Sequence, residues 1–134
     1  MHTKFQQADR VMTDIHAATN EVLKVLGPGL LETVYEQCLS RELELRGHTI
    51  EKEKRIVINY KGKTFEHILR ADLIVDDCVV VELKSVEVLM PIHFKQLRTY
   101  LRLYKKEMGW LINFGAYDFK DGLCSVKLGK EDKL

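Results

Sequence analysis

Apolar residues recur every three or four positions in three stretches of the chain, the spacing that places them on one face of a helix. The first predicted helix covers about residues 8–26 and ends at the segment GPG, because proline cannot continue the helical hydrogen bonds. The second covers 30–47, where Gly47 ends it, and the third begins at Pro91 and runs to about residue 106. The predicted inward positions of the first helix are Val11, Ile15, Ala18, Val22, Val25 and Leu26. Those of the second are Leu31, Val34, Tyr35, Cys38, Leu39 and Leu43, and those of the third are Phe94, Leu97, Leu101 and Tyr104.

The period changes to that of strands between the second and third helices. The segment 54–84 contains three runs rich in β-branched residues, separated by the turn signals YKGK and DD, which predicts a hairpin-linked meander. After the third helix, MGWLINFG predicts a fourth strand, and LCSVKL is a candidate to pair beside it. Because a helix connects the third strand to the fourth, these two should be parallel, with helices on both sheet faces. The predicted class is α/β: a mixed central sheet flanked by helices, in the order α-α-β-β-β-α-β with a further strand left open.

Length and composition narrow the class of protein. The chain has 134 residues, enough for one hydrophobic core, so we expect a single domain over residues 1–134. Apolar residues make up 46% of it and both charge signs are mixed, which excludes disordered and fibrous classes. The net charge of +1 argues against a general polyanion binder, although one face can still be basic. Three widely spaced cysteines and the lack of an apolar run long enough to span a bilayer favour a cytoplasmic protein.

Two charges interrupt the apolar run VVVELKSVEVL at 79–89. Because side chains alternate along a strand, Glu82 and Lys84 should share one face. A hairpin turn at the two aspartates that precede this strand would carry Asp72 of the previous strand close to Glu82. Buried charges persist only when they are paired, solvated or bound to a cation. Two interpretations therefore stay open: a structural ion pair involving Lys84, and a metal site for phosphodiester hydrolysis.

A metal site here would use oxygen ligands. Mg²⁺ retains several waters, so one Asp, one Glu, a backbone carbonyl and phosphate oxygens form an adequate shell. Lys84 would help hold the attacking water and stabilise negative charge at the phosphorus, and the metal would lower the pKa of that water. Mg²⁺ or Mn²⁺ is therefore the expected cofactor.

Two motifs in the chain resemble those of a known group of proteins. The pattern D-x9-E-L-K, formed by Asp72, Glu82 and Lys84, resembles the signature of the PD-(D/E)XK nuclease-like superfamily. The segment GLLETVY at 29–35 resembles the motif that names the GxxExxY protein family within it. The resemblance implies a restriction-endonuclease-like core of a helix, three strands, a helix and a strand, and the predicted element order agrees with it.

The resemblance also implies roles for individual residues. Asp72 and Glu82 would bind the metal, with the carbonyl of Leu83 as a third ligand. Lys84 would be the catalytic lysine. Glu32 would be the additional acidic residue that many members supply from the preceding helix, acting through water or as a base.

Residues outside the D-x9-E-L-K pattern each have a structural alternative. Gln96 would, by the resemblance, touch substrate or water from the third helix, or it faces solvent. Glu32 could equally be a solvated residue at the edge of its helix. Tyr35 is expected to be a core aromatic residue with a satisfied hydroxyl, and Gly29 to permit the start of the second helix.

A basic stripe follows the side of the third helix opposite Gln96. It contains Lys95, Arg98, Arg102, Lys105 and Lys106. Such a stripe can neutralise phosphates, yet a charged helix face is also commonly just solvated. Lys95, Arg98 and Arg102 are the candidate nucleic-acid contacts.

The sequence therefore favours a small nuclease-like domain that hydrolyses phosphodiester bonds with Mg²⁺ or Mn²⁺. Nucleic acid is the expected partner, DNA in preference to RNA, and no membrane partner is expected. A catalytically silent module that binds nucleic acid or a protein is the competing class, and a small-molecule phosphohydrolase is the third. Specificity would have to come from a partner or a second subunit, and a homodimer fits this requirement.

Overall fold

The structure, a computed structural model, describes residues 3–129. Its helices are α1 (Lys4–Leu26), α2 (Glu32–Leu45) and α3 (Pro91–Tyr104). Its strands are β1 (Ile50–Lys52), β2 (Arg55–Tyr60), β3 (Lys63–Arg70), β4 (Leu73–Val75), β5 (Val79–Lys84), β6 (Met108–Asn113) and β7 (Leu123–Lys127), with a short 3-10 helix η1 (Phe119–Gly122) before β7.

Local signals define the ends of the helices. Thr3 caps α1: its hydroxyl accepts a hydrogen bond from the N–H of Gln6 at 3.1 Å, and Gln6 Oε1 accepts one from the N–H of Thr3 at 2.9 Å. Gly27 follows α1 with a φ of 74°, and Pro91 is the first residue of α3. The three predicted helices are therefore confirmed. No helix between residues 3 and 129 is both long and apolar enough to cross a membrane.

Three of the predicted inward helix positions are wrong. Val25 is 70% exposed, Leu31 75% and Val34 38%. Leu31 is the N-cap of α2, where the backbone is extended, so the helical period does not apply to it. The residues that α2 buries are Tyr35, Leu39, Ser40 and Leu43.

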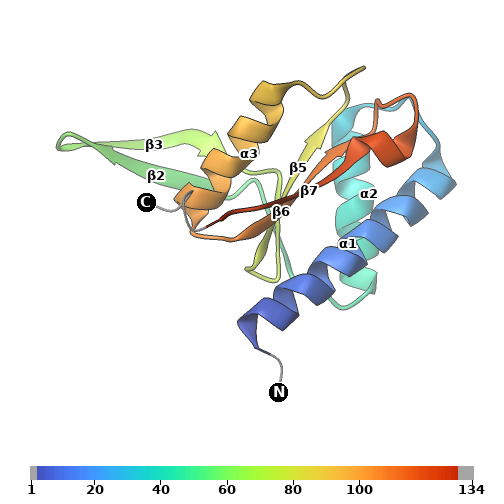
Figure 1. Ribbon diagram of the computed structural model, residues 1–134, viewed down its shortest axis with the longest axis horizontal. Coiled ribbons are helices and arrows are strands. Elements are labelled where there is room, and N and C mark those ends of the chain that lie inside the picture. Colours follow the sequence, from blue (N-terminus) through green and yellow to red (C-terminus); the bar gives the residue numbers. More distant parts are fainter. Residues whose placement is uncertain (1–2, 130–134) are drawn as a thin grey trace.

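A mixed five-stranded sheet, in the order β1-β4-β5-β6-β7, forms the centre of the molecule. β5 and β6 are parallel, as predicted for strands joined through a helix, and the other neighbours are antiparallel. α1 and α2 cover one face of this sheet and α3 covers the other (Figure 1). The α/β class and the restriction-endonuclease-like arrangement predicted from the sequence are therefore confirmed.

β5 is buried on both faces. Val79, Val81 and Leu83 pack into the core that α1 and α2 cover, and Val80 packs with Leu97 into the core that α3 covers. Burying a valine or leucine side chain stabilises the fold by about 1.5–3 kcal/mol. These contacts fix the position of the charged residues that follow on the same strand.

Strand pairing before β5 differs from the predicted meander. β2 and β3 form a separate two-stranded ribbon that projects from the rest of the molecule (Figure 1). The run of residues 69–75, predicted as one strand, is broken at Ala71 and Asp72 into β3 and β4. β4 pairs with β1, a three-residue strand that was not predicted. Asp72 consequently lies at the junction between the ribbon and the sheet.

His48 connects α1 to the turn between β4 and β5. Its Nε2 lies 2.7 Å from Asp14 Oδ2, and its Nδ1 lies 2.6 Å from Asp76 Oδ2. Because both ring nitrogens already have carboxylate partners, this histidine holds the fold together and is not available as a metal ligand.

Candidate functional site

Asp72 and Glu82 meet at the end of the β4–β5 pair. The antiparallel register that sets Leu73 opposite Val81 continues by one position and sets Asp72 opposite Glu82. The N–H of Asp72 donates to Glu82 Oε1 at 3.0 Å, and the N–H of Leu83 donates to Asp72 Oδ2 at 2.8 Å. The structure thus brings the two predicted carboxylates together in one patch.

Both carboxylates of this patch are withdrawn from water. Glu82 is 4% exposed, and burial, followed by the negative charge of Asp72, raises the pKa of Glu82 to about 8. Burial also raises the pKa of Asp72, while the N–H of Leu83 and the ammonium of Lys84 act in the opposite direction. The patch therefore holds negative charge at a cost in free energy, which a proton or a cation would relieve.

Lys84 is the last residue of β5 and shares a strand face with Glu82. Its Nζ donates to Gln96 Oε1 at 3.2 Å, and Gln96 Nε2 donates to the hydroxyl of Tyr100 at 3.3 Å. Gln96 therefore faces the strand that carries the carboxylates and holds the ammonium of Lys84 beside them. Tyr100 supports this arrangement. It was not among the predicted site residues, although it lies one helical turn from Gln96 on the same helix edge.

The backbone carbonyl of Leu83 points to the same edge of β5 as Asp72. The carbonyl of the next residue, Lys84, accepts a hydrogen bond from the N–H of Phe114 at 2.9 Å, on the β6 side of the strand. Successive peptide groups of a strand point to opposite edges, so those of Leu83 point away from β6, where its N–H meets Asp72. The third oxygen suggested by the sequence is thus directed toward the carboxylate patch.

Two further carboxylates on α2 act on the patch. Burial, followed by the charge of Asp72, raises the pKa of both Glu32 and Glu36. The two glutamates are one helical turn apart and share a face. Glu36 Oε1 is buried and has no hydrogen-bond partner among residues 3–129. Glu36 was not predicted from the sequence, although its four-residue spacing from Glu32 marks it as a neighbour on the same helix face.

Tyr35 and Gly29 shape the loop from which α2 begins. The Tyr35 hydroxyl donates to the carbonyl of Gly27 at 2.7 Å and accepts a hydrogen bond from the N–H of Leu30 at 3.2 Å, and its side chain is fully buried. Gly29 has a φ of 93°, a conformation that other residues rarely adopt. Tyr35 is therefore the core aromatic residue that was expected, and both residues position Glu32 at the helix start.

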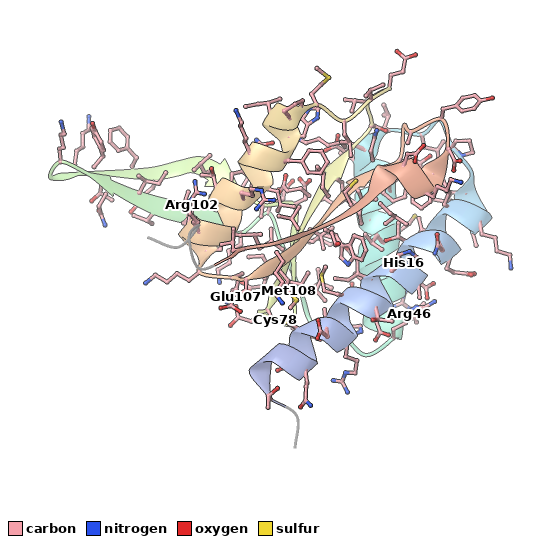
Figure 2. All side chains as sticks on the ribbon, in the orientation of Figure 1. His16, Arg46, Cys78, Arg102, Glu107 and Met108 are labelled. Atoms are coloured by element: carbon pink, nitrogen blue, oxygen red, sulfur yellow. The ribbon has the colours of Figure 1, made fainter. Side chains whose placement is uncertain are left out.

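The basic stripe predicted on α3 is shorter than expected. Lys105 adopts a left-handed conformation that ends the helix, and Lys106 lies beyond it with its Nζ 3.0 Å from Asp77 Oδ1. Figure 2 shows Arg102 near the end of α3, and its guanidinium donates to Thr99 Oγ1 at 3.1 Å. The basic residues that remain on the helix are Lys95, Arg98 and Arg102, on the side turned away from Gln96.

A cavity of about 350 Å³ lies at the other end of the parallel strands. Cys78, Glu107 and Met108 are among its lining residues, at the starts of β5 and β6 (Figure 2). Lys84 ends β5, so this cavity is separate from the carboxylate patch. Between residues 3 and 129, no three or more His, Cys, Asp and Glu side chains form a metal cluster. The patch offers two acidic side chains and a carbonyl, which is an open site rather than a closed cage.

Comparison with known proteins agrees with this geometry. A family model described as the PD-(D/E)XK nuclease superfamily matches residues 9–126, a range that includes the carboxylate patch and Lys84. The chain belongs to this superfamily. No curated protein and no solved structure matches the chain. Membership in the PD-(D/E)XK superfamily supports a nuclease-like function with nucleic acid as substrate, and its nucleases generally use divalent metals.

Proposed function

We propose that this protein is a divalent-metal-dependent nuclease that hydrolyses phosphodiester bonds, with DNA preferred to RNA. The observation that carries the proposal is the pairing of half-buried Asp72 with buried Glu82 through backbone hydrogen bonds between their strands, with Lys84 on the same face as Glu82. A balanced structural ion pair would leave both carboxylates with low pKa values. Burial and the charge of Asp72 instead raise the pKa of Glu82 to about 8, so a second negative charge in the patch is unfavourable unless a cation takes the place of the proton.

The donor atoms of the patch suit Mg²⁺ or Mn²⁺. Asp72, Glu82 and the carbonyl of Leu83 supply only oxygen, and Mg²⁺ is commonly held by one or two carboxylates with its other positions left to water and substrate phosphate. When bound, the ion would neutralise phosphoryl oxygens and acidify a water molecule.

Other residues of the site would orient the water and handle its proton. The ammonium of Lys84, held by Gln96 at 3.2 Å, would orient the attacking water and stabilise charge on the phosphoryl oxygens. Glu32, whose pKa is raised by burial and then by Asp72, would accept the proton that this water releases.

Cleavage by the purified protein tests the proposal directly. The substrates are supercoiled, linear and single-stranded DNA and an RNA of the same sequence, each incubated with Mn²⁺ and with EDTA. Lys84→Ala should slow cleavage by at least about 100-fold, because a positioned charge at the reacting phosphate is lost. Lys24→Ala, which changes an exposed lysine of α1, should leave the rate unchanged. An undiminished rate in Lys84→Ala would contradict the assigned site.

Thermal unfolding separates the nuclease from the catalytically silent module. Mn²⁺ at 100 times its dissociation constant should stabilise the protein by about 2.7 kcal/mol. The double variant Asp72→Asn, Glu82→Gln should abolish this gain. If Mn²⁺ has no effect and the double variant is simply more stable, the carboxylates form a structural network and the silent module is the better description.

Finer assignments accompany the proposal. The segment GLLETVY at 29–35 supports placement in the GxxExxY branch of the superfamily. Three cysteines without disulfide partners, Cys38, Cys78 and Cys124, fit the reducing cytoplasm.

A homodimer would supply a second recognition surface. Sedimentation of the purified protein would detect such a dimer. A small-molecule phosphohydrolase is the third candidate, but neither the 350 Å³ cavity nor a cavity of about 370 Å³ next to Glu87 and Asn113 is lined by Asp72, Glu82 or Lys84.

A further inference from the structure

The ribbon formed by β2 and β3, residues 55–70, is a prominent feature that the site does not use. Neither strand pairs with the central sheet, and the side chains at the tip stand clear of the body (Figure 2). Val57 is 53% exposed and Tyr60 61%. We propose that this ribbon is a nucleic-acid-binding arm whose tip contacts the strand that flanks the bond to be cut. The location of that bond rests on the proposed nuclease function.

The arm is the basic part of a nearly neutral chain. Residues 55–70 contain four Lys or Arg and one Glu, a formal charge of +3, while the whole chain carries +1. The remainder of the chain therefore carries −2. The ribbon therefore concentrates positive charge, in addition to the basic residues Lys95, Arg98 and Arg102 of α3, and this charge would attract a polyanion.

Lysine and aromatic side chains are combined at the tip of the arm. Lys61 Nζ lies 5.4 Å from the centre of the Tyr60 ring, and Lys63 Nζ lies 5.2 Å from that of Phe65. Tyr60 and Lys63 are also direct neighbours across the ribbon. Ammonium groups that can reach phosphates, next to rings that can stack on bases, are the combination by which proteins hold nucleic-acid strands.

Two arginines face each other at the base of the arm. Arg55 is the register partner of Arg70, and Arg70 Nη1 lies 3.3 Å from Glu53 Oε2. Like charges at directly opposed positions of a sheet are usually unfavourable for folding. Although Glu53 offsets part of this charge, the two arginines extend the basic surface of the tip to the base of the ribbon, where a phosphate backbone could follow it.

The arm is anchored next to the site and has a defined reach. The hydroxyl of Tyr104, the last residue of α3, accepts a hydrogen bond from the N–H of Ala71 at 2.9 Å and donates one to the carbonyl of Lys54. Both ends of the ribbon are thereby held against α3. From Arg70 to Lys63 the strand advances roughly 23 Å at about 3.3 Å per residue. This distance corresponds to about seven nucleotides at about 3.4 Å each.

The test measures binding separately from cleavage. The double variant Lys61→Asn, Lys63→Gln removes two charges from the tip. Residues 61 and 62 both have positive φ in a two-residue turn, where asparagine before glycine is favoured, so the ribbon should stay folded. The matched control Lys24→Gln, Lys120→Gln removes the same charge from two exposed lysines elsewhere. Binding is followed by fluorescence anisotropy in EDTA, with single- and double-stranded DNA of 6 to about 30 nucleotides.

We expect the tip variant to bind the long DNA at least about tenfold more weakly at about 0.1 M salt, with a salt dependence reduced by about two counterions. The control should bind like the unchanged protein. Equal affinity of the two variants, or no binding by the unchanged protein, would contradict the proposal that the ribbon binds nucleic acid. Arm-dependent binding without any cleavage in Mn²⁺ would instead overturn the proposed nuclease and leave the arm in place.

Discussion

Replacing Glu82 by glutamine should stabilise the metal-free protein at high pH. Burial and the charge of Asp72 raise the folded pKa of Glu82 from 4.5 to about 8. Between these pH values the folded protein keeps a proton that the unfolded chain releases, so stability is highest below pH 4.5 and is lost as pH rises through about 8. At about 1.4 kcal/mol per pH unit, this window corresponds to an upper limit of about 5 kcal/mol.

The substitution removes the charge and little else. The side-chain oxygen of glutamine can still accept the hydrogen bond that the N–H of Asp72 donates to Glu82 Oε1 at 3.0 Å. Water that enters the patch when Glu82 ionises recovers part of the upper limit, so we expect a gain of about 2 kcal/mol at pH 9. In a chain of 134 residues this gain corresponds to a rise in melting temperature of about 5–8 °C.

Thermal unfolding in EDTA at pH 5, 7 and 9 measures the effect. The difference between Glu82→Gln and the unchanged protein should grow with pH up to about 8 and then level off. Glu87→Gln, which neutralises an exposed glutamate, is the control and should show no such trend. A gain that is the same at all three pH values, or a loss of stability at pH 9, would refute the reasoning that Glu82 carries a desolvated charge.

Two other substitutions test the contribution of α2. Tyr35→Phe should lower the free energy of unfolding by about 1–2 kcal/mol in urea titrations, because the hydroxyl that links Gly27 and Leu30 is lost; an unchanged unfolding midpoint would contradict this. Glu36→Gln should raise the melting temperature in EDTA at pH 8, since it removes a charge that Asp72 repels and whose Oε1 atom is buried without a partner. It should also weaken Mn²⁺ binding about threefold to tenfold. A Mn²⁺ titration of thermal unfolding with no change in either quantity would exclude Glu36 from the site.

The parts of the fold that depend on local signals could be predicted from the sequence. The break at GPG, the stop at Gly47 and the start at Pro91 act within a few residues of themselves, and the helices follow them. The parallel pairing of β5 and β6 was also predictable, because a helix between two neighbouring strands leaves little choice of direction. These features do not depend on which distant segment supplies a partner.

Pairing between distant segments could not be predicted in the same way. Residues 69–75 continue to alternate as one strand would, yet β3 pairs with β2, and β4 pairs with β1 and β5. The three residues of β1 carry no strand signal of their own. They are ordered because Lys52 lies opposite Leu73 and because the N–H of Glu53 donates to the carbonyl of Asp72 at 2.9 Å. The division of residues 69–75 into two strands depends on which segments they pair with in the folded protein. The alternation of side chains within one segment carries no information about those partners.

The candidate site illustrates both situations. The proximity of Asp72 and Glu82 followed from alternation and one turn, both local features. The position of Gln96 depended on which way α3 faces the sheet, so its contact with Lys84 emerged only from the structure. Basic charge was expected on α3, where Lys95, Arg98 and Arg102 lie. The structure adds a compact group of basic and aromatic residues on a ribbon that the predicted meander would have paired into the sheet.

Separation of charge explains how a chain with a net charge of +1 could act on a polyanion. The ribbon of residues 55–70 carries +3, and the remainder, which includes Asp72 and Glu82, carries −2. In the proposed nuclease the arm would attract the strand, while the carboxylate patch would repel the phosphate to be cut until a cation neutralises it. Retention of the strand would then be independent of metal, and placement of the reacting phosphate would require it. Affinity measured in EDTA and the cleavage rate at saturating DNA in Mn²⁺ would therefore report on different residues. A variant of the arm should lower the affinity alone, and a variant of the patch should lower the saturated cleavage rate alone.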